Sequence, residues 1–170
     1  MVPVPEAEPT VGRHRARLDG AAAAGVPAHV TILYPFVPPD AITEETVAGL
    51  VRAVGSIAAF DCTFRRTAWF EDRVLYLAPE PDGLFRALTD AVTTAFPGYL
   101  PYGGAFSGVV PHLTIGDLPE GVTDALRAAE AEVRLALPLS ARIGQAWLMT
   151  GGTAPGSWRQ VAALPLRTPG

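Results

Sequence analysis

The chain has 170 residues, a net charge of −4 and 49% hydrophobic residues, a composition typical of one folded domain with a buried core. Its thirteen basic residues are all arginine, which excludes a ligase that carries its nucleotide on a lysine amine. The acidic balance argues against an extended nucleic-acid-binding surface, but it is compatible with a local site for one phosphate.

The ends and the single cysteine give further expectations. Residues 1–9 are neither basic nor apolar enough for a signal peptide. No stretch approaches the roughly 20 apolar residues that a membrane span needs. Cys62 has no partner for an internal disulfide, and we expect it to be buried in a strand. We therefore expect a cytoplasmic protein without membrane association, folded as a single domain over residues 1–170.

The spacing of apolar residues predicts a mixture of helices and antiparallel strands, an α+β fold. In chain order we expect an edge strand at 2–5, an exposed helix at 9–18, a strand at 28–36 and a helix at 43–54. A hairpin should follow, with strands at 60–70 and 73–78, and then a helix at 82–96. After an irregular stretch at 99–110 we expect a strand at 111–118, a helix at 121–135 and strands at 137–149 and 158–166.

One short pattern occurs twice. Residues 29–32 read His-Val-Thr-Ile, and residues 112–115 read His-Leu-Thr-Ile, each within a predicted strand. Side chains alternate between the faces of a strand, so His and Thr of each copy should share a face, about 6–7 Å apart. The residues between them should point into the core. Each copy therefore offers an imidazole and a hydroxyl on one surface.

These residue types suit chemistry at a phosphate. Imidazole titrates near neutral pH and serves as a general acid or base, and a threonine hydroxyl can donate to a phosphate oxygen. We expect the two pairs, His29/Thr31 and His112/Thr114, to face each other across a phosphate-sized cleft. One histidine would activate the nucleophile and the other would protonate the leaving oxygen, without a metal ion.

Other interpretations of the histidines remain open at this point. The two histidines could instead hold a metal ion, for which Asp117 is the available third ligand. A strand histidine can also be an ordinary packed or solvent-facing residue. The third histidine, His14, lies among Arg13, Arg15 and Arg17, and we expect it to be a solvated residue of a surface helix.

The paired motifs, roughly eighty residues apart, resemble those of the 2H phosphoesterase superfamily, also called the 2′-5′ RNA ligase-like family. Residues 28–36 and 111–116 carry the resemblance. It implies two similar lobes, each an antiparallel sheet with helices outside, that meet at a central cleft. It also implies metal-independent opening of a cyclic phosphodiester, such as a 2′,3′-cyclic nucleotide, an RNA end or an ADP-ribose cyclic phosphate. By motif, His29 and His112 would be catalytic, and Thr31 and Thr114 would bind the phosphate.

The partner should be a small nucleotide or an RNA end, because the chain lacks a cationic run. Tyr34, Tyr102 and Phe106 flank the motifs and could contact a base or sugar. Arg159 could supply positive charge to the phosphate. We expect no cofactor and a monomer. The alternatives are a non-catalytic nucleotide- or RNA-end-binding module on the same fold, a 2′-5′ RNA ligase, or a phosphoester-processing enzyme of specialised metabolism.

Overall fold

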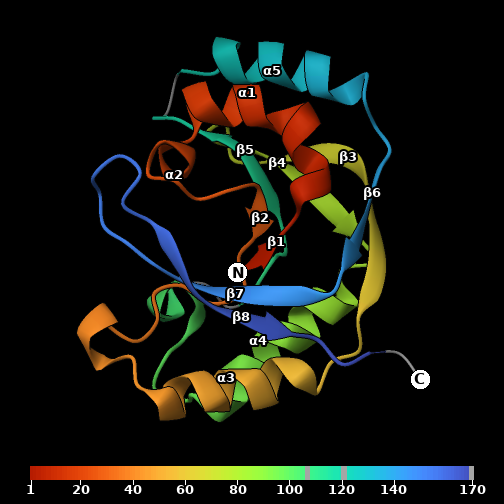
Figure 1. The fold of residues 1–170 in the computed structure, drawn as a ribbon. Coiled ribbons are helices and arrows are strands. Elements are labelled where there is room, and N and C mark those ends of the chain that lie inside the picture. The colour runs from red at the N-terminus through yellow and green to blue at the C-terminus, as the bar shows by residue number, and fades with distance from the viewer. Residues whose placement is uncertain (106–107, 120–121, 169–170) are drawn as a thin grey trace.

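The computed structural model describes residues 1–105, 108–119 and 122–168. A six-stranded antiparallel sheet runs through its centre in the order β1-β2-β5-β4-β3-β6 (Figure 1). In that order the strands are Val2–Pro3, His29–Val30, Leu113–Asp117, Val74–Glu80, Phe60–Phe70 and Leu139–Ile143. A second antiparallel sheet contains β7 (Gln145–Thr150) and β8 (Arg159–Pro165). The two sheets with helices outside them confirm the predicted fold class.

The edge strand β1 connects the two sheets. Trp147 of β7 donates its backbone N–H to the carbonyl of Met1 at 2.7 Å, and the amino terminus donates to the Trp147 carbonyl at 3.0 Å. These bonds satisfy polar groups that an edge strand would otherwise leave without a strand partner. The second sheet is therefore held beside β1 and β2, where the first motif lies.

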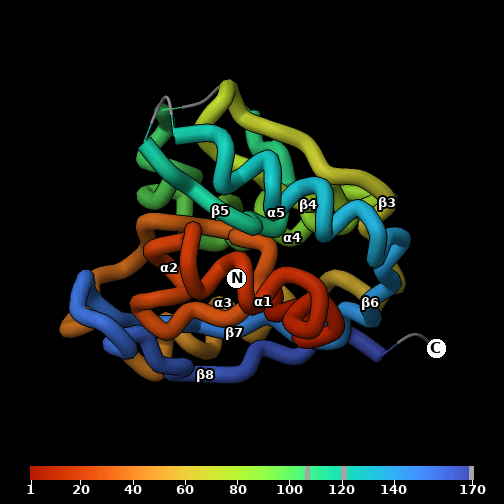
Figure 2. The backbone as a smooth tube through the Cα atoms, turned by 90° about the horizontal axis from the view of Figure 1, so that it is seen from above, coloured from red at the N-terminus to blue at the C-terminus, as the bar shows by residue number. Residues whose placement is uncertain are grey.

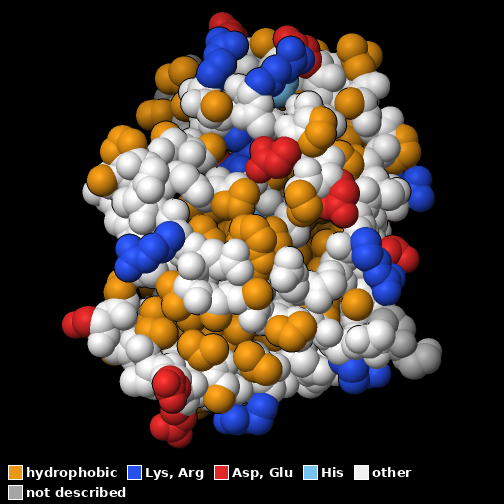
Figure 3. All heavy atoms as spheres, in the orientation of Figure 1, with side chains coloured by type: hydrophobic (Ala, Val, Ile, Leu, Met, Phe, Trp, Pro, Cys, Tyr) orange, Lys and Arg blue, Asp and Glu red, His pale blue; other side chains and the backbone are white. Residues whose placement is uncertain are grey.

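The helices lie outside the sheets (Figures 1 and 2). Helix α1 (Glu8–Leu18) lies beside α5 (Asp124–Arg134), whereas α3 (Glu44–Gly55) packs against α4 (Gly83–Ala95) and β8. The short helix α2 (Gly20–Ala23) follows α1, and 3₁₀ turns cover Pro5–Ala7, Pro39–Ala41 and Pro101–Gly104. Hydrophobic side chains gather across the middle of the face shown in Figure 3, and most charged side chains lie nearer its edge.

Most of the predicted elements are confirmed. The hairpin at 60–78 is β3 and β4, and the helices predicted from residues 43, 82 and 121 are α3, α4 and α5. Helix α3 begins with the capping box that its sequence suggests, in which Thr43 and Thr46 exchange hydrogen bonds. Cys62 is buried in β3, as expected. In the described residues, no helix combines the length and the apolar character of a membrane span.

Two predicted strands were too long. The strand expected at 28–36 forms only as β2, because the carbonyls beyond it bind other segments: Ile32 accepts from the Thr89 hydroxyl at 3.1 Å and Tyr34 from the Tyr102 N–H at 2.7 Å. The strand expected at 137–149 divides at Gly144 into β6, which pairs with β3, and β7, which pairs with β8. The chain thus changes sheets at this glycine.

The expectation that α1 is exposed was wrong. Arg15 is only 2% exposed, since its guanidinium donates to the Asp19 carboxylate at 2.8 and 3.1 Å and to the Val26 carbonyl at 3.2 Å. His14 is also buried and is not solvated as predicted. Its Nε2 atom lies 3.6 Å from the carboxylate of Glu132 on α5. The burial of Arg15 is possible because its charge is paired and hydrogen-bonded. Nε2 of His14 has no hydrogen-bond partner among the described residues, and burial lowers the pKa of this ring.

Gly116 fixes how closely β5 approaches the helices. A Cβ atom at this position would lie 2.5 Å from Cδ2 of Leu126 and 2.9 Å from Cβ of Leu18. We expect Gly116→Ala to destabilise the protein by about 1–3 kcal/mol, because α1 or α5 must move away from the strand. Chemical denaturation would measure this. Gly83→Ala is the control, since a Cβ atom there would meet no neighbour within 4 Å, and an equal effect of both substitutions would contradict the packing argument.

Candidate active site

The two motifs lie side by side on neighbouring strands. Val30 of β2 pairs with Leu113 of β5, and both are fully buried. This antiparallel register sets His29 across from Thr114, and Thr31 across from His112. The four polar side chains share the face opposite Val30 and Leu113, because side chains alternate along a strand.

This arrangement corrects one expectation. The pairs were expected to face each other from two lobes, but they are neighbours on one sheet, since β2 and β5 pair directly. The two histidines occupy diagonal positions of the strand pair, where Cα atoms lie about 7–8 Å apart. That spacing is close enough for both imidazoles to reach one phosphate group.

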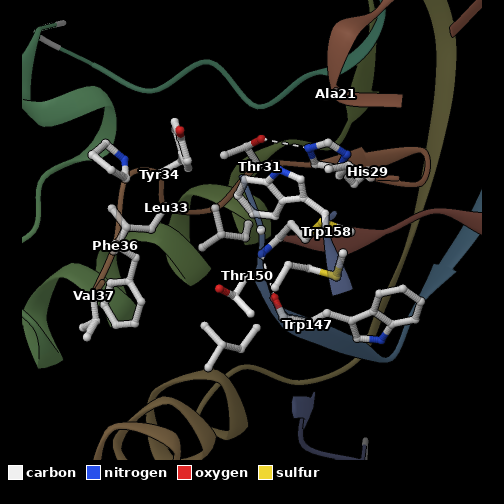
Figure 4. A pocket seen from close by; sticks show the side chains of 18 of the residues that line it. Ala21, His29, Thr31, Leu33, Tyr34, Phe36, Val37, Trp147, Thr150 and Trp158 are labelled. Carbon is white, nitrogen blue, oxygen red and sulfur yellow. Dashed lines mark hydrogen bonds between the residues drawn. The ribbon is translucent and has the colours of Figure 1, made fainter. Parts of the chain in front are cut away.

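Both imidazoles are held in the same tautomer by the backbone. Nδ1 of His29 lies 2.8 Å from the Pro27 carbonyl, and Nδ1 of His112 lies 2.7 Å from the Val110 carbonyl. A carbonyl only accepts hydrogen bonds, so each Nδ1 carries a proton and each neutral ring keeps an unprotonated Nε2. At His29 this Nε2 accepts from the Thr31 hydroxyl at 3.1 Å (Figure 4).

Burial makes both histidines weak bases. Burial lowers the pKa of His29 to about 3, although the hydrogen bond to Pro27 acts to raise it. The nearby Arg15 charge lowers this pKa further. Burial also lowers the pKa of His112, opposed by the hydrogen bond to Val110. In the free protein both rings are therefore neutral at pH 7. An anion bound between them would favour the protonated forms and raise both pKa values.

His112 has aromatic neighbours that His29 lacks in the described structure. Its ring centroid lies 4.9 Å from that of Phe70 and 5.4 Å from that of Tyr76, both in edge-to-face orientation. Phe70 and Tyr76 stack on each other at 4.3 Å. These two rings pack against the imidazole of His112 and restrict its position. Sequence reasoning did not identify these two residues.

A cavity of about 680 Å³ extends from the first motif to the β7–β8 sheet. Figure 4 shows Thr31, Tyr34 and Phe36 along one wall and Trp147 and Trp158 along the other. The Tyr34 and Trp158 rings have centroids 6.2 Å apart. The two tryptophans were missed as candidates, because nothing in the sequence around them indicates that β7 and β8 approach the first motif.

The structure brings only some of the predicted substrate-binding residues to this cavity. His29, Thr31, Tyr34 and Tyr102 line it. His112 and Thr114 are not among the described lining residues, although they lie beside the first motif. Arg159 is exposed at the start of β8 and is not among them either. Phe106 lies outside the described residues.

A two-histidine metal site finds no third ligand in the described structure. Within residues 1–105, 108–119 and 122–168, no group of three His, Cys, Asp or Glu side chains could hold a metal ion. Asp117 accepts a hydrogen bond from Nε of Arg73 at 2.9 Å. The carboxylate that was considered as a ligand is thus paired with an arginine.

Comparisons with known proteins give the family and the fold. The family model of the 2′-5′ RNA ligase superfamily matches residues 3–154. TT0787 of Thermus thermophilus is similar in structure, with a TM-score of 0.63, 18% identity and coverage of 98% of this chain and 96% of that one. LigT of E. coli in apo form has a TM-score of 0.59 and 20% identity, over 98% and 94% of the two chains. LigT of E. coli complexed with 3′-AMP has a TM-score of 0.58 and 18% identity, over 98% of this chain and 95% of that one.

No match is found among curated proteins. At these identities the solved structures show the fold, and the family model, which covers most of the chain, shows the family. The chain belongs to the 2′-5′ RNA ligase superfamily.

Proposed function

We propose that this protein is a phosphoesterase that opens a cyclic phosphodiester through acid–base catalysis by His29 and His112. The observation that carries the proposal is the strand register, which sets each histidine across from the threonine of the other motif. Two imidazoles and two hydroxyls then share one face. This set supplies a base, an acid and two donors for phosphate oxygens.

The surroundings of the two rings suggest which histidine takes which part. His29, whose pKa is lowered to about 3, accepts the proton of the attacking water at Nε2. His112 donates its proton to the leaving ribose oxygen, since His29, with its strongly lowered pKa, is the less readily protonated ring of the two. Water oxygen bonds to phosphorus as the ring P–O bond breaks, and the leaving oxygen becomes a hydroxyl.

The threonines would hold the phosphate between the two rings. The Thr31 hydroxyl donates to His29 in the free protein, and rotation about its side chain would redirect it to a phosphate oxygen. Thr114 lies across from His29 and offers a second hydroxyl. The scheme requires no metal ion for any step, because the imidazoles carry every proton.

Product formation from a panel of substrates tests the proposal. The panel contains adenosine 2′,3′-cyclic phosphate, ADP-ribose 1″,2″-cyclic phosphate and a 2′-5′ dinucleotide, each incubated with and without EDTA. We expect at least one to be converted at a rate that EDTA leaves unchanged, as measured by phosphorus NMR. The matched control is His29→Ala/His112→Ala, which should be inactive.

Two results would count against catalysis. Full activity of the double variant would end the acid–base scheme. Binding of a panel member by calorimetry without any product over hours would favour a nucleotide-binding module instead. The cytoplasmic location, the monomeric state and the single domain over residues 1–170 stay predictions.

A further inference from the structure

The cavity beside His29 is mostly apolar. None of the described residues that line it is Asp, Glu or Arg. Its walls include the hydrophobic side chains of Ile32, Leu33, Phe36, Leu148, Met149 and Leu164. Neutral hydroxyls of Thr150 and Thr153 are among the polar groups present. A ligand group that enters this cavity therefore leaves water and contacts mainly apolar side chains.

Two arginines near the motifs are bound to other partners. Arg15 binds the Asp19 carboxylate and the Val26 carbonyl, and Arg73 binds Asp117. Burial lowers the pKa of the Met1 amine to about 5, so this group is mostly neutral at pH 7. Arg159 pairs with Thr150 in the β7–β8 ladder, but it is exposed and does not line the cavity. Among the described residues that line the cavity, His29 is thus the side chain that can offer positive charge to a ligand.

The approach to the site is apolar as well. Tyr34 is 55% exposed, Leu100 is 53% exposed and Val110 is 46% exposed. The hydrogen bond from Tyr102 N–H to the Tyr34 carbonyl holds the segment after Leu100 at the cavity, and the Val110 carbonyl binds His112. Of these three exposed side chains, Tyr34 lines the cavity itself.

We propose that the substrate carries its reacting phosphate as its only charged group, on an uncharged and largely apolar body that occupies the cavity lined by Tyr34 and Trp158. The imidazoles would balance one negative charge, and the apolar body would gain from leaving water. A second phosphate would enter a cavity that offers it no cation, which makes desolvation costly. This inference rests on the proposed function, which supplies the site of the reacting phosphate. It narrows the expected substrates and disfavours compounds that contain a pyrophosphate, such as ADP-ribose cyclic phosphate.

Binding measurements test the inference separately from turnover. The wild-type protein is titrated by calorimetry with benzyl phosphate, adenosine 2′-phosphate and adenosine 2′,5′-bisphosphate, which differ in the apolar character of the body and in a second phosphate. We expect both monophosphates to bind and the bisphosphate to bind at least about 30-fold more weakly than adenosine 2′-phosphate. A bisphosphate that binds as tightly as the monophosphate would overturn the inference.

A charge placed on the cavity wall gives a second, gain-of-binding test. Thr153 is exposed and lines the cavity, so Thr153→Arg should reduce the discrimination against the bisphosphate by about tenfold or more. Ala128→Arg, at an exposed position of α5, adds the same charge elsewhere and should leave the ratio unchanged. Equal ratios in both variants and the wild type would show that the lack of cations does not set the preference.

The outcomes separate this inference from the proposed function. Conversion of cyclic phosphates without any preference for singly charged ligands would overturn the inference and leave the catalytic proposal standing. Discrimination in binding, with no conversion of any cyclic phosphate, would support the apolar, singly charged ligand class and contradict catalysis.

Discussion

Replacing either His29 or His112 by alanine is expected to lower kcat for a cyclic phosphodiester by about 10²–10⁴-fold. Each ring presents Nε2 to the shared face because its Nδ1 is bound to a backbone carbonyl. Without His29 no positioned base takes the proton of the attacking water, and without His112 the leaving oxygen departs as an unprotonated alkoxide. Steady-state kinetics on the substrate that responds best in the panel would measure both losses.

The double variant should lose little more than the single variants, because both histidines act in one displacement step and their effects are not additive. His14→Gln is the matched control, since His14 lies between α1 and α5 and contacts neither motif in the described structure. It should keep kcat within about threefold of the wild-type value. A His29 or His112 variant with activity in that range would contradict the assigned roles.

The sequence predicted the local part of this fold and left its long-range pairing undefined. Alternating and helical hydrophobic patterns located the hairpin and the helices α3, α4 and α5, because both periodicities act over a few residues. Buried residues occupy odd positions up to Ile143 and even positions from Ala146, and the single strand predicted at 137–149 overlooked this change of phase at Gly144. The phase does not reveal that β6 pairs with β3, which lies far away in sequence, whereas β7 pairs with β8.

The burial of α1 shows a similar limit, although a signal was present. Three arginines around His14 suggested a solvated helix, but Arg15 stands four residues before Asp19, the spacing of an ion pair on one helical turn. Such a pair can be buried with its remaining hydrogen bonds satisfied, here by Val26. The expectation that α1 is exposed was wrong because it considered the arginines of the helix without their i,i+4 partners.

At the site, the repeated tetrapeptide correctly suggested that each His and Thr share a face, since alternation is a local property. The cross-strand register between Val30 and Leu113 could not be predicted, because a two-residue shift would keep the same side chains on the same face. The positions of Trp158 at the cavity and of Phe70 at His112 could not be predicted either, because they depend on how separate strands pack together.

The pH dependence of kcat/KM should be bell-shaped with its optimum on the acid side of neutrality. The productive free protein has one proton on the histidine pair. This state is populated between the pKa of His29, about 3, and that of His112, which burial lowers from its usual value near 6.5. Above the His112 pKa the acid is lost, so kcat/KM should fall about tenfold per pH unit. Initial rates from pH 4 to 9 at low substrate would measure this alkaline limb.

The pH profile of kcat should lie at higher pH than that of kcat/KM. A bound phosphate anion between the rings favours their protonated forms, so both pKa values rise in the complex. The alkaline limb of kcat should therefore move upward. An alkaline limb of kcat/KM above pH 6.5 would contradict the burial of His112, and coincident limbs for kcat and kcat/KM would contradict the placement of the phosphate between the two imidazoles.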